Sequence, residues 1–210
     1  MITIEVKQVS KRFKDTLALD NVSLSLESGK IYGLIGRNGS GKTVLLKLIC
    51  GLGIPTEGEI YVRGINIAKS KEAPNDIGAI IETPGFILSA SGYANLKYLA
   101  RLRSKISDDQ IKDTMSMMGL DANSKKRVGK YSLGMRQRLG IAQAIMEGQD
   151  ILLLDEPMNG LDIHGVEDVK IILKRLRNEG KTIVLASHHM EDINELCDKT
   201  YRLDNGKLIE

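Results

Sequence analysis

Residues 36–43, with the sequence GRNGSGKT, decide the fold because of what stands on either side of them. The preceding residues 30–36, KIYGLIG, form a short apolar run of the kind that makes a strand buried on both faces. The following residues 44–52, VLLKLICGL, carry apolar side chains at helical spacing and meet a glycine at position 51. The pattern G-x-x-x-x-G-K-T between a strand and a helix predicts a phosphate-binding loop rather than a glycine-rich structural turn.

The residue types of this loop suit a magnesium-bound triphosphate. We expect Gly36, Gly39 and Gly41 to allow positive φ and to leave the loop without side chains, so that consecutive backbone amides point toward the phosphates. A helix that begins near Gly41 adds the positive end of its dipole. Lys42 supplies an ammonium for the β- and γ-phosphates, and Thr43 supplies a hydroxyl for Mg²⁺. The residues predicted to bind nucleotide are Gly36, Arg37, Asn38, Gly39, Ser40, Gly41, Lys42, Thr43 and Val44.

Further candidates follow two later apolar runs. Asp155 and Glu156 end DILLLDE (150–156), at the carboxyl end of a predicted strand, where open α/β sheets bind ligands. Asp155 suits Mg²⁺ coordination and Glu156 could orient or deprotonate an attacking water, the alternative being an ordinary acidic strand end. In TIVLASHHM (182–190), His188 or His189 could donate to a γ-phosphate oxygen. The spacing does not choose between the two, and a surface histidine is the alternative for either.

The order of patterns along the chain predicts an α/β fold. Period-two alternation in ITIEVKQV (2–9) and LALDNVSLSLE (17–27) predicts antiparallel strands. From about residue 91 to 147 the spacing is helical, with Asp108 and Asp109 expected as the cap and first-turn acids of one helix. Strands and helices alternate again from residue 150, and Asn205-Gly206 predicts a closing hairpin. We therefore expect a parallel sheet with an inserted helical segment.

The composition is that of an ordinary soluble domain and argues against several classes of protein. Of the 210 residues, 42% are hydrophobic and 27% charged, and the net charge of +3 is too mild to indicate nucleic-acid binding. No apolar run approaches the roughly 18 residues of a spanning helix, and the N-terminus lacks the apolar core of a signal peptide. Cys50 and Cys197 follow no metal or redox spacing, which favours buried thiols in a reducing compartment.

These motifs, together with YSLGMRQRLGIAQA (131–144), resemble the nucleotide-binding subunit of an ABC transporter over essentially the whole chain. Several motifs occur in the order and at the spacings of that family. The resemblance implies a P-loop NTPase core of the RecA-like type, with an N-terminal antiparallel β subdomain and an inserted α-helical subdomain. It implies one ATPase domain over residues 1–210, with the core and β subdomain in 1–86 and 149–210 and the helical subdomain in 87–148.

The resemblance assigns a role to a turn outside the phosphate loop. Ser132 and Gly134 match the family's signature turn, although Leu133 and Met135 depart from its usual glycine and glutamine. In the family this turn completes the nucleotide site of a second subunit. The resemblance therefore implies a pair of ATPase subunits, with a homodimer expected and a heterodimer left open.

The resemblance assigns roles to four more residues. Asp162 in MNGLD (158–162) matches the acid of the family's dimer-contact loop, and the first histidine of the pair, His188, matches its switch histidine. Phe13 matches the aromatic residue that stacks on adenine, a core phenylalanine being the alternative. Glu82 stands where the family usually has glutamine, and its carboxylate could approach Mg²⁺. The stretch IETPGF (81–86) resembles the branch that handles bacitracin-type and lantibiotic-type peptides.

The implied function is that of an ATP-hydrolysing subunit with ATP and Mg²⁺ as cofactors. Its expected catalytic residues are Lys42, Glu156 and His188, and its expected metal ligands are Thr43, Glu82 and Asp155. The implied partners are a separately encoded transmembrane permease, as part of an exporter, and a second ATPase subunit, with no nucleic acid. The chain would then lie in the cytoplasm, on the inner face of the membrane.

Three alternative classes can be weighed from the sequence. Soluble ABC ATPases that act on ribosomes or DNA carry two cassettes or a long coiled-coil insertion, and this chain has neither. GTPases read guanine with an Asn-Lys-x-Asp element, which is absent, and a small-molecule kinase has no role for the signature turn. The third alternative is a regulatory subunit that binds ATP without hydrolysing it. The altered signature turn leaves this class open, but it is argued against by the presence of Lys42, Asp155, Glu156 and His188.

Overall fold

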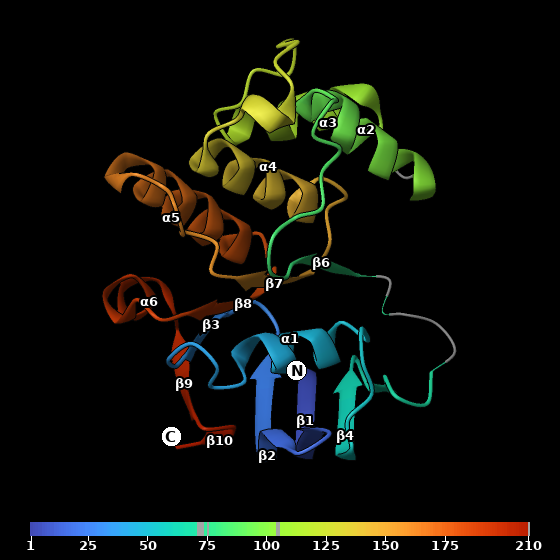
Figure 1. Ribbon diagram of the computed structural model, residues 1–210, viewed down its shortest axis with the longest axis vertical. Coiled ribbons are helices and arrows are strands. Elements are labelled where there is room, and N and C mark those ends of the chain that lie inside the picture. The colour runs from blue at the N-terminus through green and yellow to red at the C-terminus, as the bar shows by residue number, and fades with distance from the viewer. Residues whose placement is uncertain (71–73, 75, 104–105, 210) are drawn as a thin grey trace.

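A four-stranded antiparallel sheet occupies the N-terminal part of the molecule (Figure 1). The computed structural model describes residues 1–70, 74, 76–103 and 106–209. The strands lie in the order β2-β1-β4-β5. Their bounds are Ile2–Phe13 for β1, Thr16–Glu27 for β2, Glu57–Val62 for β4 and Ile65–Asn66 for β5. The prediction of antiparallel strands in residues 2–9 and 17–27 is confirmed.

The second sheet has six strands in the order β10-β9-β3-β8-β7-β6. Its bounds are Ile31–Ile35 for β3, Ile77–Ile80 for β6, Ile151–Asp155 for β7, Thr182–Ser187 for β8, Lys199–Asp204 for β9 and Lys207–Leu208 for β10. All neighbours pair in parallel except β9 and β10. These two are joined at Asn205 (φ 46°) and Gly206 (φ 79°), the positive-φ pair that a two-residue hairpin needs. The predicted parallel sheet and closing hairpin are confirmed.

Helices cover both faces of the six-stranded sheet, as Figure 1 shows. Helix α1 (Lys42–Ile49) lies between the two sheets and buries Leu45, Leu46, Leu48 and Ile49. On the other face lie α4 (Leu133–Ile145), α5 (Ile163–Asn178) and α6 (Met190–Leu196). Successive residues of β7 point to opposite cores, which is why the run ILLL is apolar throughout. Among the described residues, no helix has the length and apolar character needed to cross a membrane.

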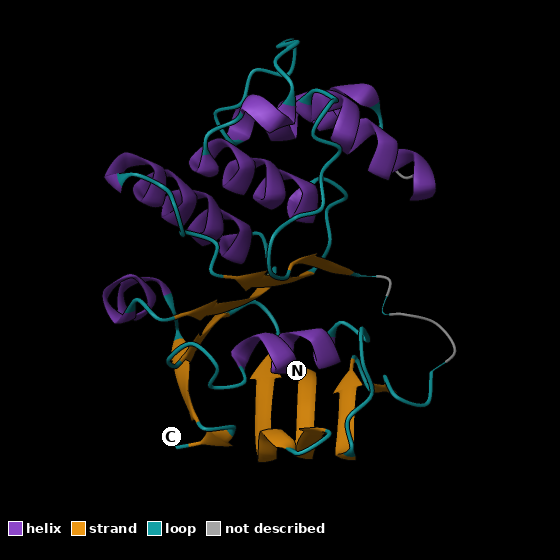
Figure 2. Cartoon of the chain, in the orientation of Figure 1, coloured by secondary structure: helices purple, strands orange, loops and turns teal. Residues whose placement is uncertain are grey.

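The segment between β6 and β7 consists of helices and loops (Figure 2). It contains α2 (Gly92–Arg103), α3 (Asp108–Met117), the 3₁₀ turn η1 (Val128–Lys130) and α4. The predicted fold class, an α/β core with an antiparallel β subdomain and an inserted helical subdomain, is confirmed. The subdomain limits at residues 86 and 148 stay a prediction.

Two local predictions need correction. Asp108 does not cap α3; Ser107 does, because its hydroxyl accepts from the amide of Gln110 while the Gln110 side chain accepts from the amide of Ser107. Asp108 and Asp109 lie in the first turn, where their charges favour the helix dipole. Strand β6 has no counterpart among the sequence-predicted strands, because glycine and alanine at its centre carry no strand signal.

Both cysteines are free and partly buried, so the expectation of buried thiols is met only in part. Burial nevertheless raises the pKa of Cys50 and of Cys197 to about 12. Both thiols therefore stay protonated at neutral pH and are poor nucleophiles.

Candidate active site

The phosphate loop runs from the end of β3 to the start of α1. Gly41 is the N-cap residue of α1. Within the part of the chain that the structure describes, the backbone amides of Gly41, Lys42, Thr43 and Val44 donate no hydrogen bond. Such amides are the unpaired donors of a helix N-terminus, and together with the helix dipole they form an anion-binding site.

The three glycines of the loop are required for two different reasons. Gly39 (φ 81°) and Gly41 (φ 107°) adopt the positive φ that was predicted for them. Gly36 does not adopt positive φ, so that part of its prediction is wrong, but the expectation that the loop needs no side chain there is confirmed. A Cβ on Gly36 would lie 2.4 Å from the Leu203 carbonyl oxygen and 2.4 Å from Ser40 Oγ. Gly36 is therefore needed for the close approach of two backbone segments.

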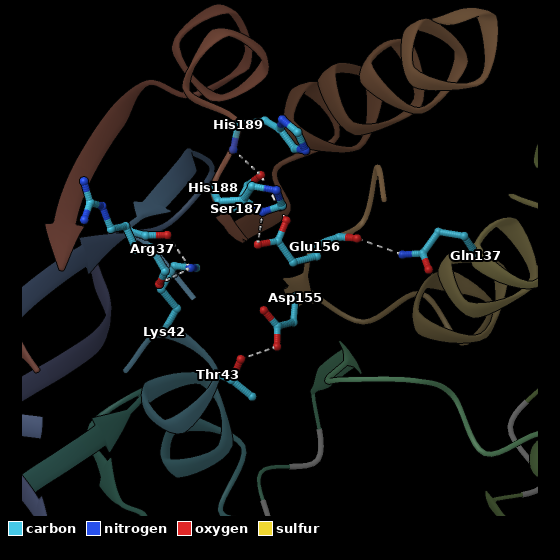
Figure 3. A network of polar contacts seen from close by, with 10 residues as sticks. Arg37, Lys42, Thr43, Gln137, Asp155, Glu156, Ser187, His188 and His189 are labelled. Atoms are coloured by element: carbon cyan, nitrogen blue, oxygen red, sulfur yellow. Dashed lines mark hydrogen bonds and ion pairs between the residues drawn. The ribbon is translucent and has the colours of Figure 1, made fainter. Parts of the chain in front are cut away.

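Lys42 is buried, and its ammonium points back into the loop (Figure 3). Its Nζ donates to the carbonyl oxygen of Gly36 at 2.6 Å and to that of Arg37 at 3.2 Å. Beside it, the buried hydroxyl of Ser40 has no hydrogen-bond partner among the described residues. A cation, an unpartnered hydroxyl and free amides around one loop fit a phosphate group, which would pair with all of them.

Thr43 and Asp155 meet across the site, one from α1 and one from the end of β7 (Figure 3). Thr43 Oγ1 donates to Asp155 Oδ2 at 2.6 Å. Burial is the main reason that the pKa of Asp155 lies above its ordinary value, and the charge of Glu156 adds to this effect. The Thr43 hydrogen bond, a backbone hydrogen bond with Glu82 and the charge of Lys42 act in the opposite direction. A hydroxyl and a carboxylate are hard oxygen donors that fit Mg²⁺, and a cation there would offset the cost of burying the carboxylate.

Glu82 lies beside this pair, but its carboxylate is engaged elsewhere. Its Oε1 accepts from Lys47 Nζ at 2.7 Å, in an ion pair whose glutamate side chain is 62% exposed. Lys47 was not predicted as a site residue. A signal for it did exist, because it follows Thr43 by four positions on α1 and so lies on the same face of that helix.

Glu156 follows β7 in the left-handed region, with φ 48°. Its Oε2 accepts from Ser187 Oγ at 3.2 Å, and its Oε1 lies 2.8 Å from His188 Nδ1. His189 instead stacks beside His188, with ring centroids 4.0 Å apart, and its amide donates to Ser187 Oγ. The structure thus brings the predicted Lys42, Asp155, Glu156 and His188 to one edge of the sheet, with His188 rather than His189 on the carboxylate.

Lys42, Asp155 and Glu156 line a cavity of about 390 Å³, here named the P-loop cavity, and His188 does not. Its walls are residues 38–44 of the loop with Ala18, Lys47, Glu82, Asp155 and Glu156. Phe13 does not line it. That ring is 52% exposed at the end of β1, with Lys11 Nζ 5.0 Å from its centroid, so the reading of Phe13 as a core residue is wrong. Its stacking on adenine stays a prediction.

Ser132, Gly134 and Asp162 lie at a different cavity, of about 680 Å³, here named the signature cavity. Its walls are residues 119–121, 131–135 and 160–162 with Ser124 and Arg138, none of which lines the P-loop cavity. Ser132 caps α4 by accepting from the amide of Met135, and Asp162 caps α5 by accepting from the amide of Gly165. The chain therefore does not bring these three residues to its own phosphate loop.

Comparison with known proteins agrees with this geometry. The family model described as "ABC transporter" matches residues 19–159. The uncharacterised ABC transporter ATP-binding protein YybJ of Bacillus subtilis is 46% identical over 98% of this chain and 94% of its own length. The bacitracin transport ATP-binding protein BcrA of Enterococcus faecalis is 39% identical over 99% of this chain and 68% of its own length. The lantibiotic transport ATP-binding protein SrtF of Streptococcus pyogenes is 34% identical over 98% of this chain and 89% of its own length.

A solved structure supports the same assignment. The dimeric structure of MJ0796, described as a bacterial ABC transporter cassette, superposes with a TM-score of 0.90 and 25% sequence identity over 99% of this chain and 97% of that one. The family match, the relatives and the residues gathered around the P-loop cavity agree. The chain belongs to the ABC transporter family, as an ATP-binding subunit that hydrolyses ATP.

Proposed function

We propose that this subunit powers a separate membrane permease that exports an antibiotic peptide. The observation that carries the proposal is the meeting of Lys42, Thr43, Asp155 and Glu156 at one cavity. His188 lies behind this group, with Nδ1 2.8 Å from Glu156 Oε1. BcrA of Enterococcus faecalis is named for bacitracin transport and SrtF of Streptococcus pyogenes for lantibiotic transport, which supports a peptide of that kind. In this proposal the permease holds the chain on the cytoplasmic face of the membrane.

The residues of the P-loop cavity take separate roles. The free amides at Gly41–Val44 and the Lys42 ammonium bind the phosphates, with Lys42 exchanging its carbonyl partners for phosphate oxygens. Thr43 and Asp155 would hold Mg²⁺, and Glu82 would join them on release from Lys47. When bound, Mg²⁺ neutralises charge that develops on the phosphate oxygens.

Glu156 serves as the general base in this proposal. Its carboxylate accepts a proton from water as the water oxygen bonds to the γ-phosphorus and the bond to the β–γ bridging oxygen breaks. ADP and inorganic phosphate are the products. His188 Nδ1 donates to one oxygen of the carboxylate, and in its imidazolium form the ring also donates through its other nitrogen toward the γ-phosphate.

The signature cavity takes part through a second copy of the chain. Ser132 and the N-terminus of α4 would bind the γ-phosphate held by the partner's loop, and Asp162 would lie at the contact between copies. The dimeric cassette described above supports a homodimer.

Export can be tested in a bacitracin-sensitive or lantibiotic-sensitive strain that expresses the chain with its permease. We expect the wild-type pair to raise the tolerated peptide concentration and Glu156→Gln to abolish the increase. Glu179→Gln, an exposed carboxylate at the end of α5, is the matched control and should behave as wild type. Equal tolerance with wild type and with Glu156→Gln would contradict the proposal.

A further inference from the structure

Gln137, on helix α4, makes a hydrogen bond to the backbone of Glu156, the proposed base. Its Nε2 donates to the backbone carbonyl oxygen of Glu156 at 3.1 Å (Figure 3). Gln137 is on α4, and Glu156 directly follows β7. The hydrogen bond therefore joins the helices inserted between β6 and β7 to the parallel sheet.

The backbone of Glu156 is strained and needs to be held. A φ of 48° places this non-glycine residue in the left-handed region, where the Cβ strains the backbone. Its amide donates to the carbonyl oxygen of Ala186 at 2.8 Å. The carbonyl oxygen, at the other end of the residue, is the atom that Gln137 holds. With the amide and the carbonyl both bound, the direction of the Cα–Cβ bond is determined, and with it the starting point of the carboxylate.

Gln137 is itself placed firmly, because α4 rests on the core without a gap. Gly140 and Ala144 follow Gln137 by three and seven positions, so all three share one face of the helix. A Cβ on Gly140 would lie 2.9 Å from Pro84 Cγ. A Cβ on Gly78, in β6, would lie 1.9 Å from the Ala144 carbonyl oxygen. Helix α4 thus cannot shift toward the sheet, and its position determines where the Gln137 amide lies.

We propose that Gln137 is a positioning residue for hydrolysis: its amide holds the left-handed backbone of Glu156 and thereby aims the carboxylate at the attacking water. The proposal rests on the role of Glu156 as the base. It implies that the alignment of the base depends on the tight packing of α4 against the sheet.

The first test replaces the side-chain amide and keeps its size. Gln137→Met has no donor, and Gln137→Glu presents a carboxylate to the Glu156 carbonyl. For both purified variants we expect kcat to fall roughly tenfold to a hundredfold, as for a displaced catalytic group, while KM and calorimetric ATP affinity change by less than about twofold. Gln143→Met is the control, since Gln143 is on the same helix and its side chain makes no hydrogen bond among the described residues; it should keep the wild-type kcat.

The second test asks whether Gln137 acts through the carboxylate. In single-turnover assays Gln137→Met should cause no further loss in a Glu156→Gln background, because no base is left to aim. An unchanged kcat in the Gln137 variants, or an equal loss in both backgrounds, would overturn the proposal. Full turnover by Glu156→Gln alone would instead remove Glu156 from its role as the base. Thermal unfolding of each variant, compared with Gln143→Met, separates loss of the fold from loss of alignment.

Discussion

The P-loop cavity and the signature cavity differ in how far the chain completes them. At the P-loop cavity, Lys42 and Asp155 are buried and already paired with groups of the same chain. At the larger signature cavity, the hydroxyl of Ser132 and the carboxylate of Asp162 cap their own helices. The comparison teaches that the groups we propose for hydrolysis gather within one chain. In the same proposal, the signature cavity offers the N-termini of α4 and α5 to a group from a second copy.

The strongest test of this contrast is Glu156→Gln. The P-loop cavity keeps its phosphate-binding groups in this variant and loses its base. We expect hydrolysis to fall by about a hundredfold or more, with ATP affinity retained. Phosphate release measures the first quantity and titration calorimetry the second. Hydrolysis at the wild-type rate would remove Glu156 from the mechanism.

Lys42→Ala should weaken binding as well as turnover. It removes the buried ammonium beside Gly36 and Arg37, and hydrogen bonds to charged groups contribute about 1.5–3 kcal/mol. ATP affinity should therefore fall by roughly tenfold to a hundredfold, as measured by calorimetry. Lys112→Ala, on the exposed face of α3, serves as the control and should bind ATP as wild type does. Unaltered affinity in Lys42→Ala would show that the loop does not bind the phosphates.

Ser132→Ala tests whether the signature cavity affects turnover without affecting ATP binding at the P-loop cavity. A single chain should bind ATP with unchanged affinity, because Ser132 does not line the P-loop cavity. Turnover at concentrations that allow dimerisation should fall about tenfold, since hydrogen bonds to charged groups contribute about 1.5–3 kcal/mol. Loss of the α4 cap should lower the free energy of unfolding by about 1 kcal/mol. Weakened ATP binding to the monomer would break the separation between the two cavities.

Substitution of Glu82 tests whether its carboxylate approaches Mg²⁺ in the P-loop cavity, and a smaller effect is expected. If its carboxylate leaves Lys47 for Mg²⁺, then Glu82→Ala should raise the Mg²⁺ concentration for half-maximal turnover a few-fold, and Glu82→Gln somewhat less. A magnesium titration of ATP turnover, with and without the permease, gives the comparison. If both variants match wild type under both conditions, Glu82 is not a metal-proximal ligand.

Asp155→Asn tests how much the buried carboxylate of Asp155 lowers the stability of the folded chain. Because burial holds the pKa of Asp155 above its ordinary value of 3.8, the folded chain binds more protons than the unfolded chain between the two values. This contribution to stability is fully present below pH 3.8 and is lost as the pH rises through the folded pKa. In nucleotide-free buffer with chelator, Asp155→Asn should therefore have a higher Tm than wild type at neutral pH. The difference should close toward acid pH; a difference independent of pH would contradict this origin.

The main elements and most of the P-loop cavity follow from local sequence. Strands β3, β7 and β8 are continuous apolar runs, and Lys42, Asp155, Glu156 and His188 each stand directly after such a strand or in the helix that follows it. Because the carboxyl ends of parallel strands meet at one edge, predicting the strands also predicts that these residues gather.

The tertiary structure alone decided features that join distant segments. The Lys47–Glu82 pair spans 35 positions, and the Gln137–Glu156 bond links a helix to the end of a strand. Strand β6 is recognisable only by its pairing with β7, and Gly36 is required only because Leu203 and Ser40 come close to it. Periodicity and spacing report how one segment is patterned, whereas a hydrogen bond or a steric contact between segments depends on how the folded chain packs them. For that reason the sequence determined which chemical groups stand at the ends of the strands, and packing decided which of them hold one another.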